Sequence, residues 1–259
     1  VYKKVAEKDH FVYAADVSGV SAPHYLIADI DSGSMLAASD LRTAVPIASV
    51  TKLMTAVVTS EKLDLDSRIG VSSPNFVESL IPRLQDRASA SVYSLLQLLL
   101  VESSNEAAEV IAGEYGRGKF IEEMNSKAKQ IGMLESNFVD PSGLGNGNTS
   151  TLSDLFRLTQ YIHINRNFIF EITAKENLTG VRDTGEFSEL SNFNEVDDLN
   201  NFVGGKIGET TAAGQTSVSL HEVSIQGSKR TVAIILLGST QRDQDVRTLM
   251  EFVEEQYRR

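Results

Sequence analysis

The spacing of apolar positions changes along the chain and predicts strands at both ends with helices between them. A period of two around 24–38, broken by a turn at 31–34, predicts a hairpin. Apolar positions at helical spacing predict helices that begin near 49, 92, 106, 119 and 153. Beyond Gly205 the period returns to two, which predicts strands over 216–220 and 231–237. A final amphipathic helix has one apolar face, formed by Val246, Leu249, Met250, Val253 and Tyr257.

This order of elements predicts an α+β fold. The N- and C-terminal strands should form one antiparallel sheet that helices cover, with a mainly helical lobe inserted between the strands. We expect a single catalytic domain over 1–259 with two lobes. The sheet lobe takes about 20–48 and 202–259, and the helical lobe takes about 49–201.

Composition excludes several classes of function. The chain has 259 residues, no cysteine and a net charge of −11, which argues against a nucleic-acid partner because such partners usually need a basic face. No apolar stretch approaches the roughly 18 residues of a membrane-spanning helix. Without cysteine there are no disulfides and no thiolate zinc sites. The four histidines are not spaced as metal ligands, so we expect neither a metal nor a cofactor.

The most informative motif is Ser49-Val50-Thr51-Lys52, at the start of a predicted helix. Residues three apart share a helix face, so the Ser49 hydroxyl and the Lys52 amine can meet. The apolar segment 44–48 before them would exclude water, which favours a neutral Lys52 that acts as a base on the serine. The backbone N–H of Ser49 would also face a developing oxyanion. The alternative is that Ser49 only caps the helix and Lys52 is solvated.

Other matches to catalytic patterns are interpreted as chance. Ser126-Lys127-Ala128-Lys129 repeats the serine-lysine spacing, but its charged neighbours predict an exposed helix without a catalytic role. Asp183-Thr184-Gly185 matches the aspartic-protease triplet, but its charged flanks favour a turn.

Two further motifs extend the first. Ser103-Ser104-Asn105 breaks a leucine-rich helix, and polar groups at such a break should face a partner or a cavity. Lys206-Ile207-Gly208 lies at the mouth of the C-terminal strands, where glycine permits close approach of a ligand or a backbone. Each alone has a plain interpretation, as a helix cap or a strand start with a surface lysine. In this order, S-x-x-K, S-x-N and K-x-G form the motif set of serine β-lactamases and penicillin-binding proteins.

Over about residues 22–257 the chain resembles the serine D-alanyl-D-alanine carboxypeptidases, which are low-molecular-weight penicillin-binding proteins of the SxxK acyltransferase superfamily. Segment 46–56 resembles the family's nucleophile segment, and 103–108 resembles its S-x-N-D-A-A segment with Glu106 for aspartate. Segment 140–144 resembles its N-P-T-G-L loop, and 205–210 resembles its K-T-G strand. The resemblance implies the fold of β-lactamases and transpeptidases. The family often carries a C-terminal β-domain and an amphipathic membrane anchor. The given sequence shows neither, so either they were trimmed or this protein lacks them.

The resemblance also implies a mechanism, in which a serine D,D-peptidase removes the terminal D-alanine from peptidoglycan stem peptides. Ser49 would attack the carbonyl between two D-alanines, and Lys52 would take its proton. Ser103 would relay a proton to the leaving amine, while Asn105 would orient Lys52 or the substrate amide. Lys206 would attract the substrate carboxylate and should lower the pKa of Lys52, as burial should. β-Lactam antibiotics would acylate Ser49 by the same attack.

The strand after Lys206 is implied to bind substrate through Ile207, Gly208, Glu209 and Thr210, and the backbone N–H groups of Ser49 and Glu209 would form the oxyanion hole. One position departs from the family, because its K-T-G threonine is Ile207 here. That hydroxyl helps to hold the terminal carboxylate, and isoleucine cannot replace its hydrogen bond.

Lys206, Thr210 or Arg247 are candidates to compensate for the missing hydroxyl. The alternatives to a carboxypeptidase are a D,D-endopeptidase on cross-linked peptides and a catalytically weakened penicillin-binding relative. A β-lactamase is disfavoured, because Val196 occupies the glutamate position of the Glu-x-x-Leu-Asn loop of the class A enzymes. The function implies an extracytoplasmic location, in the periplasm or the cell-wall space, after removal of a signal peptide.

Overall fold

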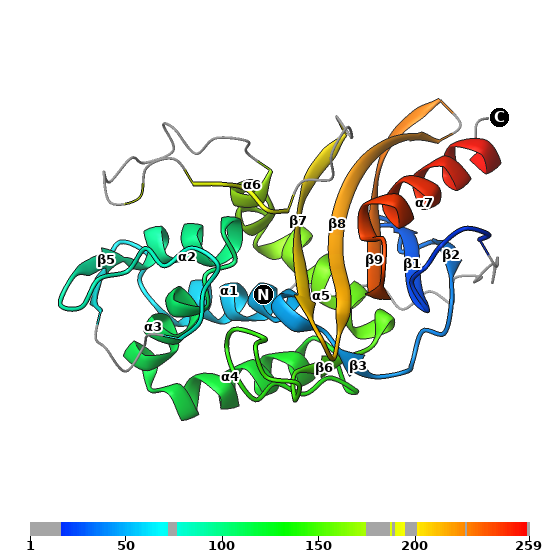
Figure 1. The fold of residues 1–259 in the computed structure, drawn as a ribbon. Helices are drawn as coiled ribbons and strands as arrows, with labels where there is room; N and C mark the ends of the chain where they lie inside the picture. The colour runs from blue at the N-terminus through cyan, green and yellow to red at the C-terminus, as the bar shows by residue number, and fades with distance from the viewer. Residues whose placement is uncertain are drawn as a thin grey trace.

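The computed structural model of the chain describes residues 17–71, 77–174, 187, 190–194, 201–225 and 227–257. Its main sheet has five strands in the order β2-β1-β9-β8-β7, and every neighbouring pair is antiparallel (Figure 1). The strands are β1 (His24–Asp29), β2 (Met35–Ala38), β7 (Phe202–Thr210), β8 (Gly214–Ile225) and β9 (Ser228–Ser239). The two N-terminal strands therefore join the three C-terminal strands in one sheet, in which β1 pairs with β9. The predicted α+β fold is confirmed.

The helices lie between the two groups of strands in the sequence. They are η1 (Ala48–Val50), α1 (Thr51–Lys62), α2 (Val92–Val101), α3 (Asn105–Tyr115), α4 (Arg117–Gln130), α5 (Leu152–Asn165) and α6 (Phe168–Thr173). A last helix, α7 (Arg242–Tyr257), follows β9. Two short pairs of strands link the loops, β3 (Val45–Pro46) with β6 (Thr149–Ser150) and β4 (Arg68–Gly70) with β5 (Ser89–Ser91).

The sheet separates two apolar layers, because successive side chains of a strand point to opposite faces. On β9, Ile234 and Leu236 join the layer under α7, whereas Ile235 and Leu237 join the larger core among the other helices. Val246, Leu249, Met250 and Val253 of α7 are buried, as the predicted apolar face requires. In Figure 1, α7 lies along one side of the sheet, with α5 and α1 on the other side.

Local sequence explains where several helices begin. Ser91, Ser104 and Thr151 precede α2, α3 and α5, and each side chain accepts a hydrogen bond from a backbone N–H of the first turn. Such caps satisfy N–H groups that have no partner within the helix. The apolar residues of α2 are buried on all sides, since this helix lies inside the larger core.

The structure also has elements that periodicity did not predict, namely α6, β3, β4, β5, β6 and the first part of β7. Gly204 and Gly205 interrupt the alternation there, yet both lie inside β7. Asp183-Thr184-Gly185 and Val196 lie outside the described residues. The division into two lobes stays a prediction, and α5, assigned to the helical lobe, packs directly on β9 and β1.

Candidate active site

Ser49 and Lys52 meet at the start of α1. Ser49 lies half-buried in η1, and Lys52 follows in the first turn of α1 with its side chain fully buried. Lys52 Nζ donates to Ser49 Oγ at 2.8 Å, to Asn105 Oδ1 at 2.7 Å and to the Ser142 carbonyl at 2.7 Å. These three acceptors match the three N–H groups of an ammonium and fix the amine beside the hydroxyl.

The environment of Lys52 favours a neutral amine. Burial lowers the pKa of Lys52 to about 7, and the negative charge of Asp140 opposes this shift. The neutral and charged forms are therefore both populated near neutral pH, as a general base requires. The sequence predicts that repulsion from Lys206 also lowers the pKa of Lys52. In the structure, burial is the cause that lowers this pKa.

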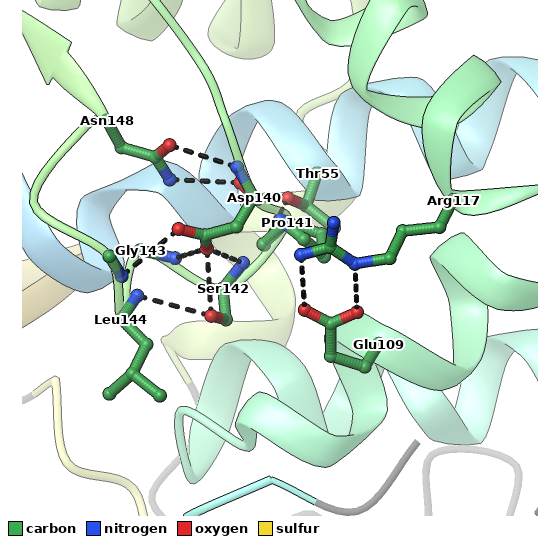
Figure 2. Close-up of polar contacts among 10 residues, drawn as sticks. Thr55, Glu109, Arg117, Asp140, Pro141, Ser142, Gly143, Leu144 and Asn148 are labelled. Atoms are coloured by element: carbon green, nitrogen blue, oxygen red, sulfur yellow. Dashed lines mark hydrogen bonds and ion pairs between the residues drawn. The ribbon is translucent and has the colours of Figure 1, made fainter. Parts of the chain in front are cut away.

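A loop around Asp140 contacts Lys52 through the Ser142 carbonyl, and Figure 2 shows the polar contacts within this loop. Asp140 Oδ1 accepts hydrogen bonds from the Ser142 N–H, the Ser142 hydroxyl and the Gly143 N–H at 2.6–2.9 Å. Gly143 has φ of 82°, and a Cβ there would lie 1.9 Å from the Ala48 carbonyl oxygen. Glycine is therefore required for this loop to approach the turn that carries Ser49.

Polar contacts from Asn148 and Thr55 hold the same loop against α1. Asn148 donates to the Thr51 hydroxyl at 3.1 Å and to the Asp140 carbonyl at 2.9 Å. The Thr55 hydroxyl donates to the Pro141 carbonyl at 2.6 Å. Figure 2 shows these groups around the loop, with the ion pair of Arg117 and Glu109 beside them.

The predicted break between α2 and α3 is present, and it brings Asn105 to Lys52. Asn105 begins α3, and its amide nitrogen donates to the Glu78 carbonyl at 2.6 Å while its oxygen accepts from Lys52. Ser103 lies half-buried at the break with φ of 57°. Ala48, which precedes Ser49, has φ of 47°. Positive φ is costly for residues other than glycine and is often found at functional sites, so both strained positions support a site here.

Lys206 reaches the same region from β7. Its side chain is fully buried, and Nζ donates to Asn194 Oδ1 at 3.2 Å and to the Ile207 carbonyl at 2.8 Å. Burial, then repulsion from Lys52 and from Arg242, holds the pKa of Lys206 well below its ordinary value. The two lysines of the motifs are therefore close enough for their charges to interact.

The free edge of β7 faces Ser49. A Cβ on Gly208 would lie 2.5 Å from the Ser49 backbone nitrogen, so the missing side chain of this glycine lets β7 approach Ser49 closely. Along the edge, the Gly205 N–H donates to Thr173 Oγ1 and the Ile207 N–H donates to Asn194 Oδ1. Alternation in an antiparallel strand places the Glu209 N–H on the same edge. The N–H groups of Ser49 and Glu209 lie on neighbouring elements, and the oxyanion hole stays a prediction.

The other predicted binding residues of β7 differ in their surroundings. The Glu209 side chain is exposed, whereas Thr210 is half-buried and its hydroxyl accepts from the Ala213 N–H at 3.1 Å. Ile207 is half-buried and lies opposite Ser217 of β8.

Sequence analysis missed two residues at this site, Arg242 and Asn194. Arg242 begins α7, its charge lowers the pKa of Lys206, and its N–H donates to Gln215 Oε1 at 2.9 Å. Arg247, the arginine singled out from the sequence, lies further along α7 and is not among the groups that shift Lys206. Neither missed residue belongs to a motif, because both depend on how distant segments pack.

The second serine-lysine copy lies on α4, and the expected exposure is wrong for Lys127. That side chain is buried, and Nζ forms an ion pair with Glu61 and contacts the Tyr161 hydroxyl at 3.5 Å. Lys127 is buried because α4 packs against α1, which carries Glu61. Ser126 and Lys129 are exposed, so this copy lacks the enclosed pairing of Ser49 and Lys52.

The described residues contain neither a metal-binding cluster nor a membrane-spanning helix. Within them, no group of three or more His, Cys, Asp or Glu side chains is arranged to hold a metal ion. No helix there combines the length and apolar character needed to span a bilayer.

Comparisons with known proteins agree with the geometry. The peptidase S11 family, described as D-alanyl-D-alanine carboxypeptidase, matches residues 11–240. The D-alanyl-D-alanine carboxypeptidase DacB2 of Mycobacterium tuberculosis is 30% identical over 222 residues, which are 84% of this chain and 75% of that protein. A D-alanyl-D-alanine endopeptidase of Pseudomonas aeruginosa is 39% identical over 138 residues, which are 51% of this chain and only 44% of that protein.

Solved structures give the same result. The crystal structure of a D-alanyl-D-alanine carboxypeptidase from Mycobacterium tuberculosis has a TM-score of 0.82 at 27% identity and covers 93% of both chains. Penicillin-binding protein D2 from Listeria monocytogenes, in its cefotaxime-bound form, has a TM-score of 0.78 at 27% identity, covering 91% of this chain and 96% of that one. The resemblance found in the sequence is confirmed, and the chain belongs to the D-alanyl-D-alanine carboxypeptidase family of serine peptidases.

Proposed function

We propose that this protein is a serine D,D-peptidase that removes the terminal D-alanine from peptidoglycan stem peptides through an acyl-enzyme on Ser49. The observation that carries the proposal is the 2.8 Å contact between Ser49 Oγ and the fully buried Nζ of Lys52. A neutral Lys52 takes the hydroxyl proton as Ser49 attacks the carbonyl between the two D-alanines. The N–H groups of Ser49 and Glu209 stabilise the negative charge on the carbonyl oxygen.

Collapse of the tetrahedral intermediate breaks the peptide bond and leaves the shortened peptide esterified to Ser49. The leaving D-alanine amine takes a proton through Ser103, and water then hydrolyses the ester and regenerates the serine. Asn105 holds Lys52 in place throughout, since its oxygen accepts from Nζ at 2.7 Å.

We further propose that Lys206 and Arg242 provide the positive potential for the substrate's terminal carboxylate. Lys206 is fully buried, and Arg242 lies near enough to lower its pKa. Gly208 and Thr210, which lie on the same strand as Lys206, would lie beside the bound peptide. In this proposal the chain forms one catalytic domain with the site between the sheet and the helices, and it acts outside the cytoplasm, where peptidoglycan is found.

A D,D-endopeptidase is the second candidate. Ile207 supplies no hydroxyl for a terminal carboxylate, and a relative in Escherichia coli that is 36% identical over 138 residues is also named D-alanyl-D-alanine endopeptidase. An endopeptidase cleaves an internal bond of a cross-linked peptide by the same attack of Ser49. Incubation with a pentapeptide and with a cross-linked dimer separates the two activities, because only an endopeptidase converts the dimer to monomers.

The first test is the intact mass of the protein after incubation with benzylpenicillin. We expect one covalent adduct on the wild type and none on Ser49→Ala. Ser126→Ala is the matched control, since it removes the serine of the other copy of the same spacing, and it should be acylated like the wild type. An adduct that persists on Ser49→Ala, or a wild type that stays unmodified at every pH from 5 to about 9, would contradict the proposal.

A further inference from the structure

Asn194 connects the end of α2 to the catalytic strand β7. Its side chain is 1% exposed. The amide nitrogen donates to the Leu100 carbonyl at 2.7 Å, in the last turn of α2. The amide oxygen accepts from Lys206 Nζ at 3.2 Å and from the Ile207 N–H at 3.1 Å. One amide group therefore ties the helix that precedes Ser103 to the strand that carries Lys206.

The segment that carries Asn194 is itself fixed by the end of this helix. The last carbonyls of a helix have no partner within it and need hydrogen-bond donors from elsewhere. Here the Phe193 N–H donates to the Val101 carbonyl at 3.1 Å, beside the contact of Asn194 with Leu100. The Ser191 N–H donates to Glu102 Oε1 at 2.9 Å. Contacts with the end of α2 thus fix the segment that carries Asn194, and Asn194 in turn contacts Lys206.

Among the described residues, Lys206 contacts no opposite charge, so its charged form is disfavoured until an anion enters the site. An ammonium has three N–H groups, and two of them have the neutral acceptors Asn194 Oδ1 and the Ile207 carbonyl. The charged groups that shift its pKa are Lys52 and Arg242, and both are positive. An aspartate at position 194 would have nearly the same shape but would neutralise this field.

We propose that Asn194 is a positioning residue that fixes Lys206 Nζ with a neutral oxygen and so leaves the lysine charge for an anionic group of the substrate. This inference rests on the proposed function, because it concerns binding at the same site. A carboxylate that enters the site supplies the opposite charge that the protein withholds, and it gains a charge-assisted hydrogen bond. Discrimination between an acid and its uncharged ester is then set by residue 194 as well as by Lys206.

The same contact also orders the edge of β7. Because Asn194 occupies the Ile207 N–H, the next N–H on this edge is that of Glu209, which follows Gly208, the residue that approaches Ser49. Loss of the amide oxygen would free both Lys206 and this part of the strand. Asn194 therefore affects both the position of Lys206 and the position of the predicted oxyanion hole.

The experiment compares acylation of the full chain by benzylpenicillin and by its methyl ester, which lacks the carboxylate. Intact mass gives the rate with each reagent for the wild type, Asn194→Asp and Asn194→Ala. We expect the wild type to react faster with the acid. In Asn194→Asp the acid-to-ester rate ratio should fall about tenfold, because the new carboxylate pairs with Lys206 and repels the reagent. In Asn194→Ala the ratio should fall by a smaller factor, about threefold.

The matched control is Asn201→Asp, which places the same charge at the start of β7. Asn201 contacts the Glu222 carbonyl and His221 rather than Lys206, and its ratio should stay within about twofold of the wild type. Circular dichroism reports folding, and if Asn194→Asp does not fold, the ratio of Asn194→Ala decides. If the acid-to-ester rate ratios of the folded Asn194 variants equal that of the wild type, the proposed role of Asn194 is overturned but the proposed function is not. A wild type that neither reagent acylates would overturn the proposed function, and this inference with it.

Discussion

Ile207 of β7 lies directly opposite Ser217 of β8, and the Ser217 hydroxyl is buried with no hydrogen-bond partner among the described residues. Residues paired across two strands share a face, so a hydroxyl at 207 would lie next to this oxygen. The position where the family has threonine is thus apolar here, while its cross-strand neighbour is still polar.

We expect Ile207→Thr to speed acylation by benzylpenicillin roughly tenfold, since a hydrogen bond to a charged group contributes about 1.5 kcal/mol or more. The new hydroxyl can also bond to Ser217. Urea unfolding of Ile207→Thr, Ser217→Ala and the double variant measures this coupling, which should be about 1 kcal/mol. In the wild-type background Ser217→Ala should be neutral or stabilising. Acylation that does not increase in Ile207→Thr would show that the missing hydroxyl does not limit this enzyme.

The acylation rate should fall on the acid side of neutrality. Burial lowers the pKa of Lys52 to about 7, so the fraction of neutral lysine declines about tenfold for each pH unit below that value. A fluorescent penicillin and stopped-flow mixing give the rate at each pH, with circular dichroism to confirm that the protein stays folded. A rate that stays constant from pH 8 down to about 5 would exclude Lys52 as the base.

Gly143→Ala should disrupt the site although it adds one methyl group. The new Cβ would lie 1.9 Å from the Ala48 carbonyl oxygen, and φ at this position is 82°. We expect the melting temperature to fall by several degrees, about 2 kcal/mol or more of stability, and acylation to fall at least about tenfold. Gly118→Ala is the control, because a Cβ there meets nothing within 4 Å and alanine favours a helix. Equal effects of the two substitutions would contradict the role assigned to Gly143.

Arg242 and Arg247 offer a direct comparison between the two arginines of α7. The charge of Arg242 acts on Lys206, whereas that of Arg247 is not among the causes of its pKa shift. Arg242→Ala should lower the acid-to-ester rate ratio with benzylpenicillin about tenfold, and Arg247→Ala should leave that ratio within about twofold. The reverse result would restore Arg247 as the arginine that compensates for Ile207.

His221 should make the protein less stable in acid. Burial lowers its pKa to about 4, whereas an exposed histidine titrates near its ordinary value of 6.5. Between these values the unfolded chain binds more protons, so the free energy of unfolding falls as the pH drops from 6.5 to 4. The loss is about 3 kcal/mol at most.

Urea unfolding at pH 7 and at about pH 4.5 tests this effect. His221→Gln should reduce the difference in stability between the two pH values, because glutamine does not titrate. If His221→Gln keeps the difference of the wild type, another group causes the acid sensitivity.

The local pattern of residues is enough to predict most of the elements and the fold class. Apolar spacing predicted the hairpin, most helices and the last amphipathic helix, because a repeat of 2 or 3.6 residues is a local property of the backbone. The order of the three motifs also indicated the family, because the residues that carry the chemistry lie close together within each motif.

Which of these residues meet depends on how the elements pack. Lys52 contacts Asn105, which is 53 positions away, and Ser142, which is 90 positions away. The two serine-lysine copies have the same spacing, yet only Ser49 and Lys52 are enclosed by α3, the Asp140 loop and β7. For the same reason, the sequence pattern did not indicate Asn194 and Arg242 as site residues. A periodic pattern reports which face of an element is buried, whereas contacts between distant side chains depend on how the elements pack.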